Sequence, residues 1–198
     1  MKHKQIIGVT GCARTGKDLF CNIAGSILTH KGFRVRKFAL AHALKKDCQQ
    51  FLNTKCGLNV WTNDTIEKSK LRPILIAYGD IKRHDSDGTY FTSILQPLIE
   101  RCDADFTFIS DVRYAQYDKD EHYWLKNIMN GKLIHLSQYS IGSTHLDKLY
   151  TQPANYNETM NDPKMRALAD ICVEWSRTTQ NELTNIVNET LKSLKIIE

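Results

Sequence analysis

A glycine-rich segment near the amino terminus has the residue types and spacing of a phosphate-binding loop. Gly11, Gly16 and Lys17 form the pattern G-x-x-x-x-G-K, in which the glycines permit a backbone whose N–H groups turn towards phosphate oxygens. The lysine would reach the β- and γ-phosphates of a nucleotide. A glycine turn with a surface lysine would show the same residues, so the flanking elements decide between the two. The residues expected to bind the nucleotide are Gly11, Cys12, Ala13, Arg14, Thr15, Gly16, Lys17 and Asp18.

The residue after this lysine is Asp18, where such loops usually carry a serine or threonine that binds Mg²⁺. A carboxylate is also a hard oxygen ligand, so it can hold the same ion directly or through water. Negative charge is favourable in the first turn of a helix as well, which gives Asp18 a purely structural alternative. Leu19 follows where many such loops have another hydroxyl group. One side-chain contact to the α-phosphate would therefore be missing.

A second motif, "FTFISDVR", places Asp111 and Arg113 just after an apolar run. In a fold with a phosphate loop, an acidic residue at such a strand end can order the water shell of Mg²⁺. An arginine there can grip a phosphate with two parallel hydrogen bonds. A local Asp–Arg pair in a surface turn is the alternative. We expect Asp18 and Asp111 to be the metal-binding residues.

These motifs need a strand before them and a helix after the loop, and the apolar pattern supplies both. The expected strands are residues 6–9, 33–40, 105–110, 132–136 and 170–175. The expected helices are residues 20–28, 42–52, 91–99 and 183–194. Strands that alternate with helices predict one α/β domain, in which a parallel sheet is covered on both faces. Ligands of such sheets bind beyond the carboxyl ends of the strands.

Two polar stretches do not fit this alternation, residues 53–90 and residues 137–169. Both follow element ends that should lie at the ligand-binding edge, where long excursions often serve as lids or substrate-binding flaps. Surface loops are the alternative. The first stretch is rich in lysine and arginine, which an acceptor carrying its own phosphate would need for charge neutralisation.

The composition excludes several classes of protein. The chain has 198 residues and a net charge of +5, which suits an anionic small substrate or a solvated basic face. Its six cysteines form no C-x-x-C pair, so neither a zinc ribbon nor a disulfide scaffold is indicated. No apolar run is long enough to span a membrane, and no signal peptide is evident. We therefore expect a cytoplasmic protein with no membrane or nucleic-acid partner.

Several segments in order resemble the phage-type deoxynucleoside monophosphate kinases, a branch of the P-loop nucleoside monophosphate kinase superfamily. The segments are "GCARTGKD", "FALAHALK", "KLRPILIAYGDIKR", "ISDVR" and "KLIHL", which together cover most of residues 5–136. Animal phosphomevalonate kinase is also similar, since its "GKDF" loop is close to "GKDL" here. The match makes Asp18 the family's usual residue. The segment "AHALK" lacks the family's proline.

This resemblance implies a three-layer P-loop kinase fold with a five-stranded parallel sheet, an acceptor-binding region at about residues 40–100 and a lid at about residues 137–169. It implies ATP and Mg²⁺ as cofactors, a nucleoside monophosphate as acceptor, a possible homodimer and, for a phage protein, a host cytoplasm. The positions matched to acceptor-phosphate contacts are Lys45, Arg72, Arg83 and Arg113. The expected catalytic residues are Lys17, Arg113 and Arg166.

The sequence predicts phosphoryl transfer from ATP to a nucleoside monophosphate, deoxy by resemblance. Two alternatives stay open. One is a kinase of a small phosphorylated metabolite such as phosphomevalonate. The other is a nucleotide-binding regulator without transfer activity, which the single arginine of the lid, Arg166, would suit.

Overall fold

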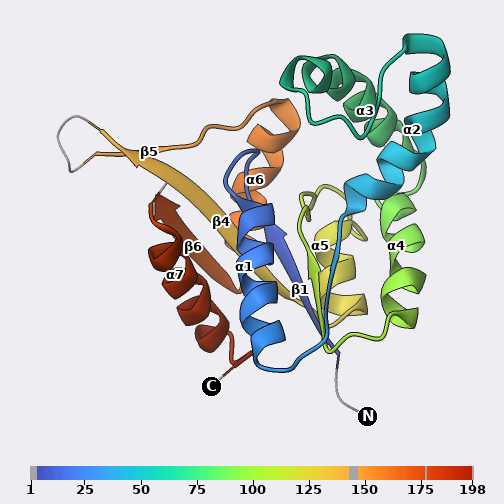
Figure 1. The fold of residues 1–198 in the computed structure, drawn as a ribbon. Helices are drawn as coiled ribbons and strands as arrows, with labels where there is room; N and C mark the ends of the chain where they lie inside the picture. The colour runs from blue at the N-terminus through green and yellow to red at the C-terminus, as the bar shows by residue number, and fades with distance from the viewer. Residues whose placement is uncertain (1–3, 143–146, 177, 198) are drawn as a thin grey trace.

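The computed structural model describes residues 4–142, 147–176 and 178–197 of the chain (Figure 1). The strands are β1 (Gln5–Thr10), β2 (Val35–Phe38), β3 (Phe106–Ile109), β4 (Lys132–Ile141), β5 (Lys148–Tyr150) and β6 (Ile171–Ser176). The helices are α1 (Lys17–His30), α2 (Leu40–Cys56), α3 (Thr65–Asp85), α4 (Tyr90–Arg101), α5 (Glu121–Tyr123), the π-helical segment η1 (Trp124–Ile128), α6 (Tyr156–Leu168) and α7 (Gln180–Ser193).

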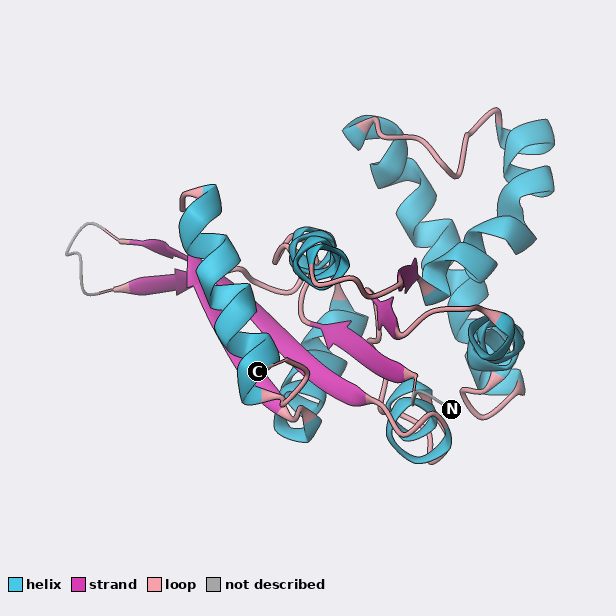
Figure 2. Cartoon of the chain, turned by 60° about the horizontal axis from the view of Figure 1, so that its bottom comes forward, coloured by secondary structure: helices cyan, strands magenta, loops and turns pink. Residues whose placement is uncertain are grey.

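The sheet contains the five parallel strands that the sequence predicts. They lie in the order β2-β3-β1-β4-β6 (Figure 2). The short strand β5, which was not predicted, pairs antiparallel with the end of β4, and β4 itself runs beyond its predicted end. Because β1 lies directly between β3 and β4, the segments that follow these three strands meet at one edge of the sheet.

Helices cover both faces of the sheet, as predicted (Figure 1). The apolar run of β1 is buried on both sides, as in a central parallel strand. Ile7 and Val9 pack in a core with α1 and α7, whereas Ile6 packs in a second core with α4, η1 and α6. Full burial of each such side chain contributes roughly 1.5–3 kcal/mol to folding. The two cores therefore hold the strand ends in a rigid frame.

Residues 53–90 form a helical layer rather than the surface loops considered as an alternative. The helix α3 has 21 residues, and the side chain of Asp64 caps its first turn by accepting a hydrogen bond from the amide of Glu67 at 2.7 Å. A separate apolar cluster with Leu52, Val60 and Leu71 joins α2 to α3. Figure 1 shows this pair of helices beside the sheet, near α6.

Residues 137–169 contain the end of β4, the strand β5 and the helix α6, with residues 143–146 outside the described part of the chain. The polar helix α6 buries Met165 against the core of the second face. Its amino-terminal turn reaches the carboxyl edge of the sheet. No helix among the described residues is both long enough and apolar enough to cross a membrane.

Candidate functional site

The segment between β1 and α1 has the backbone that its glycines predict. Gly11 has φ +129° and Gly16 has φ +87°, conformations that other residues rarely adopt. A Cβ atom on Gly11 would overlap the carbonyl oxygen of Leu136, and one on Gly16 would lie 2.6 Å from the indole ring of Trp175. Both positions therefore require glycine for conformation and for space.

Lys17 is held inside this loop. Its Nζ donates hydrogen bonds to the carbonyl oxygens of Gly11, at 2.7 Å, and Cys12, at 2.5 Å. Burial, and then the nearby charge of Arg113, lower the pKa of Lys17 to about 8. A phosphate beside Lys17 would add negative charge that favours the buried ammonium.

Trp175 on β6 packs against the loop and forms a hydrogen bond with its backbone. Its Nε1 donates a hydrogen bond of 2.8 Å to the carbonyl oxygen of Thr15, and the Thr15 hydroxyl donates one of 2.9 Å to the carbonyl of Cys12. Trp175 is almost completely buried and packs against Phe20 of α1. No motif in the sequence identifies this residue, because a tryptophan in a buried strand is normally only part of the core.

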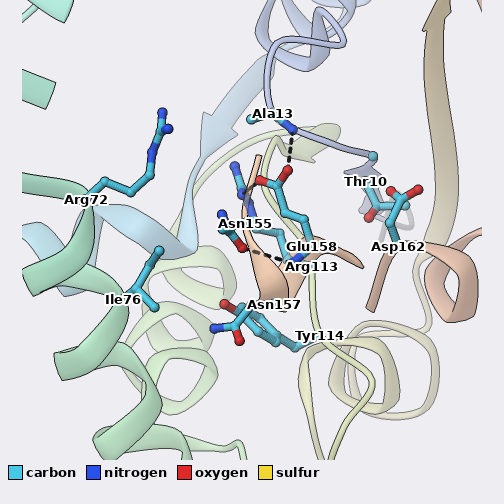
Figure 3. A pocket seen from close by; sticks show the side chains of 11 residues that line it. Thr10, Ala13, Arg72, Ile76, Arg113, Tyr114, Asn155, Asn157, Glu158 and Asp162 are labelled. Carbon is cyan, nitrogen blue, oxygen red and sulfur yellow. Dashed lines mark hydrogen bonds and ion pairs between the residues drawn. The ribbon is translucent and has the colours of Figure 1, made fainter. Parts of the chain in front are cut away.

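A carboxylate occupies the mouth of the loop. One oxygen of Glu158, from α6, accepts hydrogen bonds from the amides of Ala13 at 3.0 Å and Ala154 at 2.9 Å, and its other oxygen accepts from Arg113 at 2.7 Å (Figure 3). Burial would raise the pKa of Glu158, but the two amides and the charge of Arg113 hold it below its usual value. Glu158 is therefore an anion bound to the loop.

The sequence reasoning missed Glu158 as a functional residue. The only signal for it is local: Asn155 caps α6 by accepting a hydrogen bond of 3.0 Å from the amide of Glu158. An asparagine and a glutamate three residues apart resemble a capping pattern, which locates the start of a helix. That pattern carries no information about what the glutamate contacts elsewhere.

The strand-end motif of β3 lies beside the loop, as the sequence predicts, but its two charged residues have different surroundings. The carboxylate of Asp111 accepts hydrogen bonds from the amides of Leu40, at 2.7 Å, and Ala41, at 2.8 Å, and so holds the start of α2. Burial raises its pKa. Arg113 points into the site and binds Glu158.

Asp18 lies in the first turn of α1 with its side chain 77% exposed, 3.2 Å from the Nζ of Lys37. Among the described residues, no group of three or more histidines, cysteines, aspartates or glutamates could hold a metal ion. Mg²⁺ is commonly held by one or two carboxylates together with substrate phosphates. Both oxygens of Asp111 already accept amides of α2, which leaves the exposed Asp18 as the oxygen donor beside the loop that is open to an ion.

A small cavity lies between the loop, α3 and α6 (Figure 3). Its volume is about 140 Å³. The residues that line it are Thr10, Gly11, Ala13, Arg72, Ile76, Arg113, Tyr114, Asn155, Asn157, Glu158 and Asp162. Two of the arginines expected to bind the acceptor, Arg72 and Arg113, therefore share one cavity. Tyr114 and Ile76 add apolar surface to it.

The other two residues expected at the acceptor phosphate lie elsewhere. Arg83 is buried, with its guanidinium stacked 3.6 Å from the ring centre of Tyr114 and hydrogen-bonded to Asp80 at 2.9 Å. Lys45 lies on α2 with its Nζ 5.4 Å from the ring of Trp61. Arg83 thus contacts Tyr114, which lines the cavity, without lining the cavity itself. Lys45 lies beside Trp61 and does not line the cavity either.

Arg166, expected to be the catalytic arginine of the lid, lies on another side of the loop. Its guanidinium donates hydrogen bonds to the hydroxyl of Ser137 at 2.8 Å and to Glu174 at 3.0 Å. It lines a second cavity of about 280 Å³, which also borders the loop at Cys12 and Thr15. The structure does not bring Arg166 together with Arg113.

A second carboxylate of α6 faces the loop. Asp162 borders both cavities, and its Oδ1 lies 3.1 Å from Nε2 of the buried His135. Burial would raise the pKa of Asp162, but the hydrogen bond and the electrostatic attraction between Asp162 and His135 hold this pKa below its usual value. The side of α6 that meets the loop is therefore acidic, whereas the sequence reasoning expected it to supply an arginine.

No protein-family model matches the chain, and no curated protein matches its sequence. Among solved structures, the chain is similar to shikimate kinase from Bacteroides thetaiotaomicron, with 10% identity and a TM-score of 0.49 over 96% of this chain and 98% of that one. Dephospho-CoA kinase from Campylobacter jejuni gives 14% identity and a TM-score of 0.48 over 97% and 98% of the two chains. Shikimate kinase from Acinetobacter baumannii gives 13% identity and a TM-score of 0.43 over 98% of this chain and 94% of that one. All three are kinases of small molecules.

Proposed function

We propose that this protein is an ATP-dependent phosphotransferase. The observation that carries the proposal is the anion position at the loop, where the amide of Ala13 and the guanidinium of Arg113 hold the carboxylate of Glu158. These donors, with Lys17 buried behind them, form the arrangement that a phosphate group requires. Names of structural neighbours such as shikimate kinase and dephospho-CoA kinase agree with a small-molecule kinase.

In this proposal Lys17 and the loop amides bind the donor phosphates. Asp18 would bind Mg²⁺, and Asp111 would order the water molecules around the ion. The ion, when bound, would neutralise part of the phosphate charge. Asp111 also keeps the start of α2 in place through its two amide contacts. Arg113 would stabilise the negative charge on the transferred group.

The acceptor in this proposal is a nucleoside monophosphate, with a deoxyribose sugar. Arg72 and Arg113 would hold its phosphate, and the ring of Tyr114 with the side chain of Ile76 would contact the planar base. Arg83, stacked behind Tyr114, would position that ring rather than touch the acceptor. No general base is required, because the acceptor phosphate is already ionised at neutral pH.

One observation favours a second candidate function, a nucleotide-binding regulator without transfer activity. The helix α6 presents Glu158 and Asp162 to the loop, while its arginine, Arg166, is paired with Glu174. A kinase needs positive charge near the transferred phosphate. Arg166 would have to exchange Glu174 for that phosphate before it could contribute.

A panel assay separates these functions. Purified protein with MgATP would be offered each ribo- and deoxyribonucleoside monophosphate and then phosphomevalonate, with ADP formation as the readout. We expect a diphosphate from one subset of nucleotides, and we expect Lys17→Ala to abolish it. Turnover of phosphomevalonate alone would make the protein a metabolite kinase. Binding of MgATP with no product from any acceptor would identify the regulator.

A further inference from the structure

The contacts of Glu158 are those of a ligand rather than of a surface side chain. Its side chain is 8% exposed, and its carboxylate has three donors, the amides of Ala13 and Ala154 and the guanidinium of Arg113. Ala13 belongs to the loop, and Arg113 follows β3, so the three elements converge on one anion. A carboxylate and a phosphate edge present similar pairs of oxygens to such donors.

The volume of the site leads to the same conclusion. The cavity beside Glu158 is about 140 Å³, whereas pockets that hold small molecules are roughly 300–1,000 Å³. Glu158 and its neighbour Asn157 form part of the cavity wall, together with Arg72 and Arg113. A phosphate that binds at Ala13 and Arg113 therefore needs the donors that the first turn of α6 now takes, and the cavity on that side is too small for an acceptor as well.

The same turn of α6 also binds the helix α3. The side-chain amide of Asn157 donates to both oxygens of Asp80, at 3.0 and 3.1 Å, and Asp80 in turn accepts a hydrogen bond from the buried Arg83. Asn157 and Glu158 are adjacent, so one turn contacts the loop on one side and α3 on the other. A shift of Glu158 away from Ala13 would move Asn157 with it.

We propose that Glu158 is an internal ligand of the phosphate loop, which the phosphates of the nucleotide must displace. Displacement moves the first turn of α6 and thereby releases the contact of Asn157 with Asp80, which opens the cavity on the side of α3. Arrival of the donor is in this way coupled to access for the acceptor. The inference rests on the proposed function only in its need for a polyphosphate ligand.

The test removes the charge of Glu158 and keeps its shape. Glu158→Gln cannot form the charged pair with Arg113, so its side chain competes less strongly with phosphate. Inorganic tripolyphosphate and MgATP would be titrated into the wild-type protein and into the variant by calorimetry. We expect the variant to bind tripolyphosphate about tenfold more tightly, because a hydrogen bond to a charged group is worth at least that factor.

Glu182→Gln is the matched control. Glu182 is exposed and holds the same position in α7 that Glu158 holds in α6, three residues after a capping side chain. Glu182→Gln removes the same charge from the same position of a helix as Glu158→Gln does, but away from the loop. We therefore expect unchanged affinity for tripolyphosphate. Equal affinity of wild type and Glu158→Gln would overturn the inference, as would absence of binding by both.

A measurement on the wild type covers the case in which the variant does not fold. Hydrogen–deuterium exchange would follow the peptide around residues 152–160 with and without tripolyphosphate. Release of Glu158 frees the amide of Ala154, so we expect faster exchange with the ligand, and unchanged or slower exchange would contradict the inference. Failure of the proposed function looks different: Glu158→Gln gains affinity as expected, while no acceptor in the panel is phosphorylated.

Discussion

Substitution of Trp175 by phenylalanine tests how the loop is supported from the sheet. The change keeps an aromatic ring in the core beside Phe20 but removes the Nε1 that donates to the carbonyl oxygen of Thr15. It also removes part of the surface against which Gly16 packs. The loop should therefore lose both the hydrogen bond to the carbonyl of Thr15 and part of the packing against Gly16.

The magnitude follows from these contacts. A buried carbonyl that loses its donor costs about 1–3 kcal/mol, and the Thr15 residue is 2% exposed. The smaller ring leaves a cavity and removes transfer free energy, together roughly 1–2 kcal/mol. We expect Trp175→Phe to lower the free energy of unfolding by roughly 2–5 kcal/mol and to weaken MgATP binding, because the loop backbone is less constrained.

The assay is urea unfolding at neutral pH, together with calorimetric titration of MgATP. Trp61→Phe serves as the control, since Trp61 is 37% exposed and lies against His42 and Lys45 on the helical layer. Its free energy of unfolding should change by less than about 1 kcal/mol. A loss of under about 1 kcal/mol in Trp175→Phe, with unchanged MgATP affinity, would refute the reasoning.

Three further substitutions test the charged groups of the site. Asp18→Ser should raise the Mg²⁺ concentration needed for half-maximal activity, whereas a near-normal Mg²⁺ titration would leave Asp18 only a helix-end charge. Asp111→Asn cannot accept from both amides of α2, so urea unfolding should show a loss of about 1–3 kcal/mol, and an unchanged midpoint would contradict this. Glu121 lies behind the site, where its carboxylate accepts hydrogen bonds from the amides of Arg113 and Tyr114. Burial and then the charge of Asp120 raise the pKa of Glu121 to about 8 from 4.5. The folded state therefore holds a proton that the unfolded state releases, and stability is lost as the pH rises from about 4.5 to about 8, by at most roughly 1.4 kcal/mol per pH unit. Glu121→Gln should flatten that slope in urea titrations at several pH values, and an equal slope would exclude Glu121 as its source.

The centre of the parallel sheet could be predicted because its strands β1 and β3 are buried on both faces. Every residue of β3, and every residue of β1 after Gln5, is buried, and most of them are apolar. The glycines of the loop mark the turn between β1 and α1. The strand β5 could not be predicted in this way. Lys148, Leu149 and Tyr150 are all exposed, so no alternation of buried and exposed residues marks them as a strand.

The part of the site that could be predicted is the part that follows strand ends. Lys17 and Arg113 were both expected to be catalytic residues, and Arg113 lies beside the loop, where it binds the same carboxylate as the amide of Ala13. Arg83 lies in residues 53–90, where the apolar pattern predicted no helix, and its direction depends on the packing of Tyr114 and Asp80, which only the folded chain determines. Glu158 is 145 residues from the amide that it binds, and no local spacing encodes that contact.

The charge around the loop limits what α6 can do in this position. Lys17 and Arg113 supply two positive groups, and the ionised Glu158 and Asp162 oppose them, so the loop region is close to neutral without a nucleotide. A polyphosphate entering beside both carboxylates would meet repulsion of the kind that destabilises like charges in a low-dielectric site. In the proposed function, phosphoryl transfer therefore requires the first turn of α6 to withdraw Glu158, whereas Arg166 lies in the last turn of the helix, beside the buried Met165. A protein in which this turn stays in place would bind nucleotide weakly and transfer nothing, so under the proposal the kinase and the regulator differ in whether nucleotide displaces Glu158.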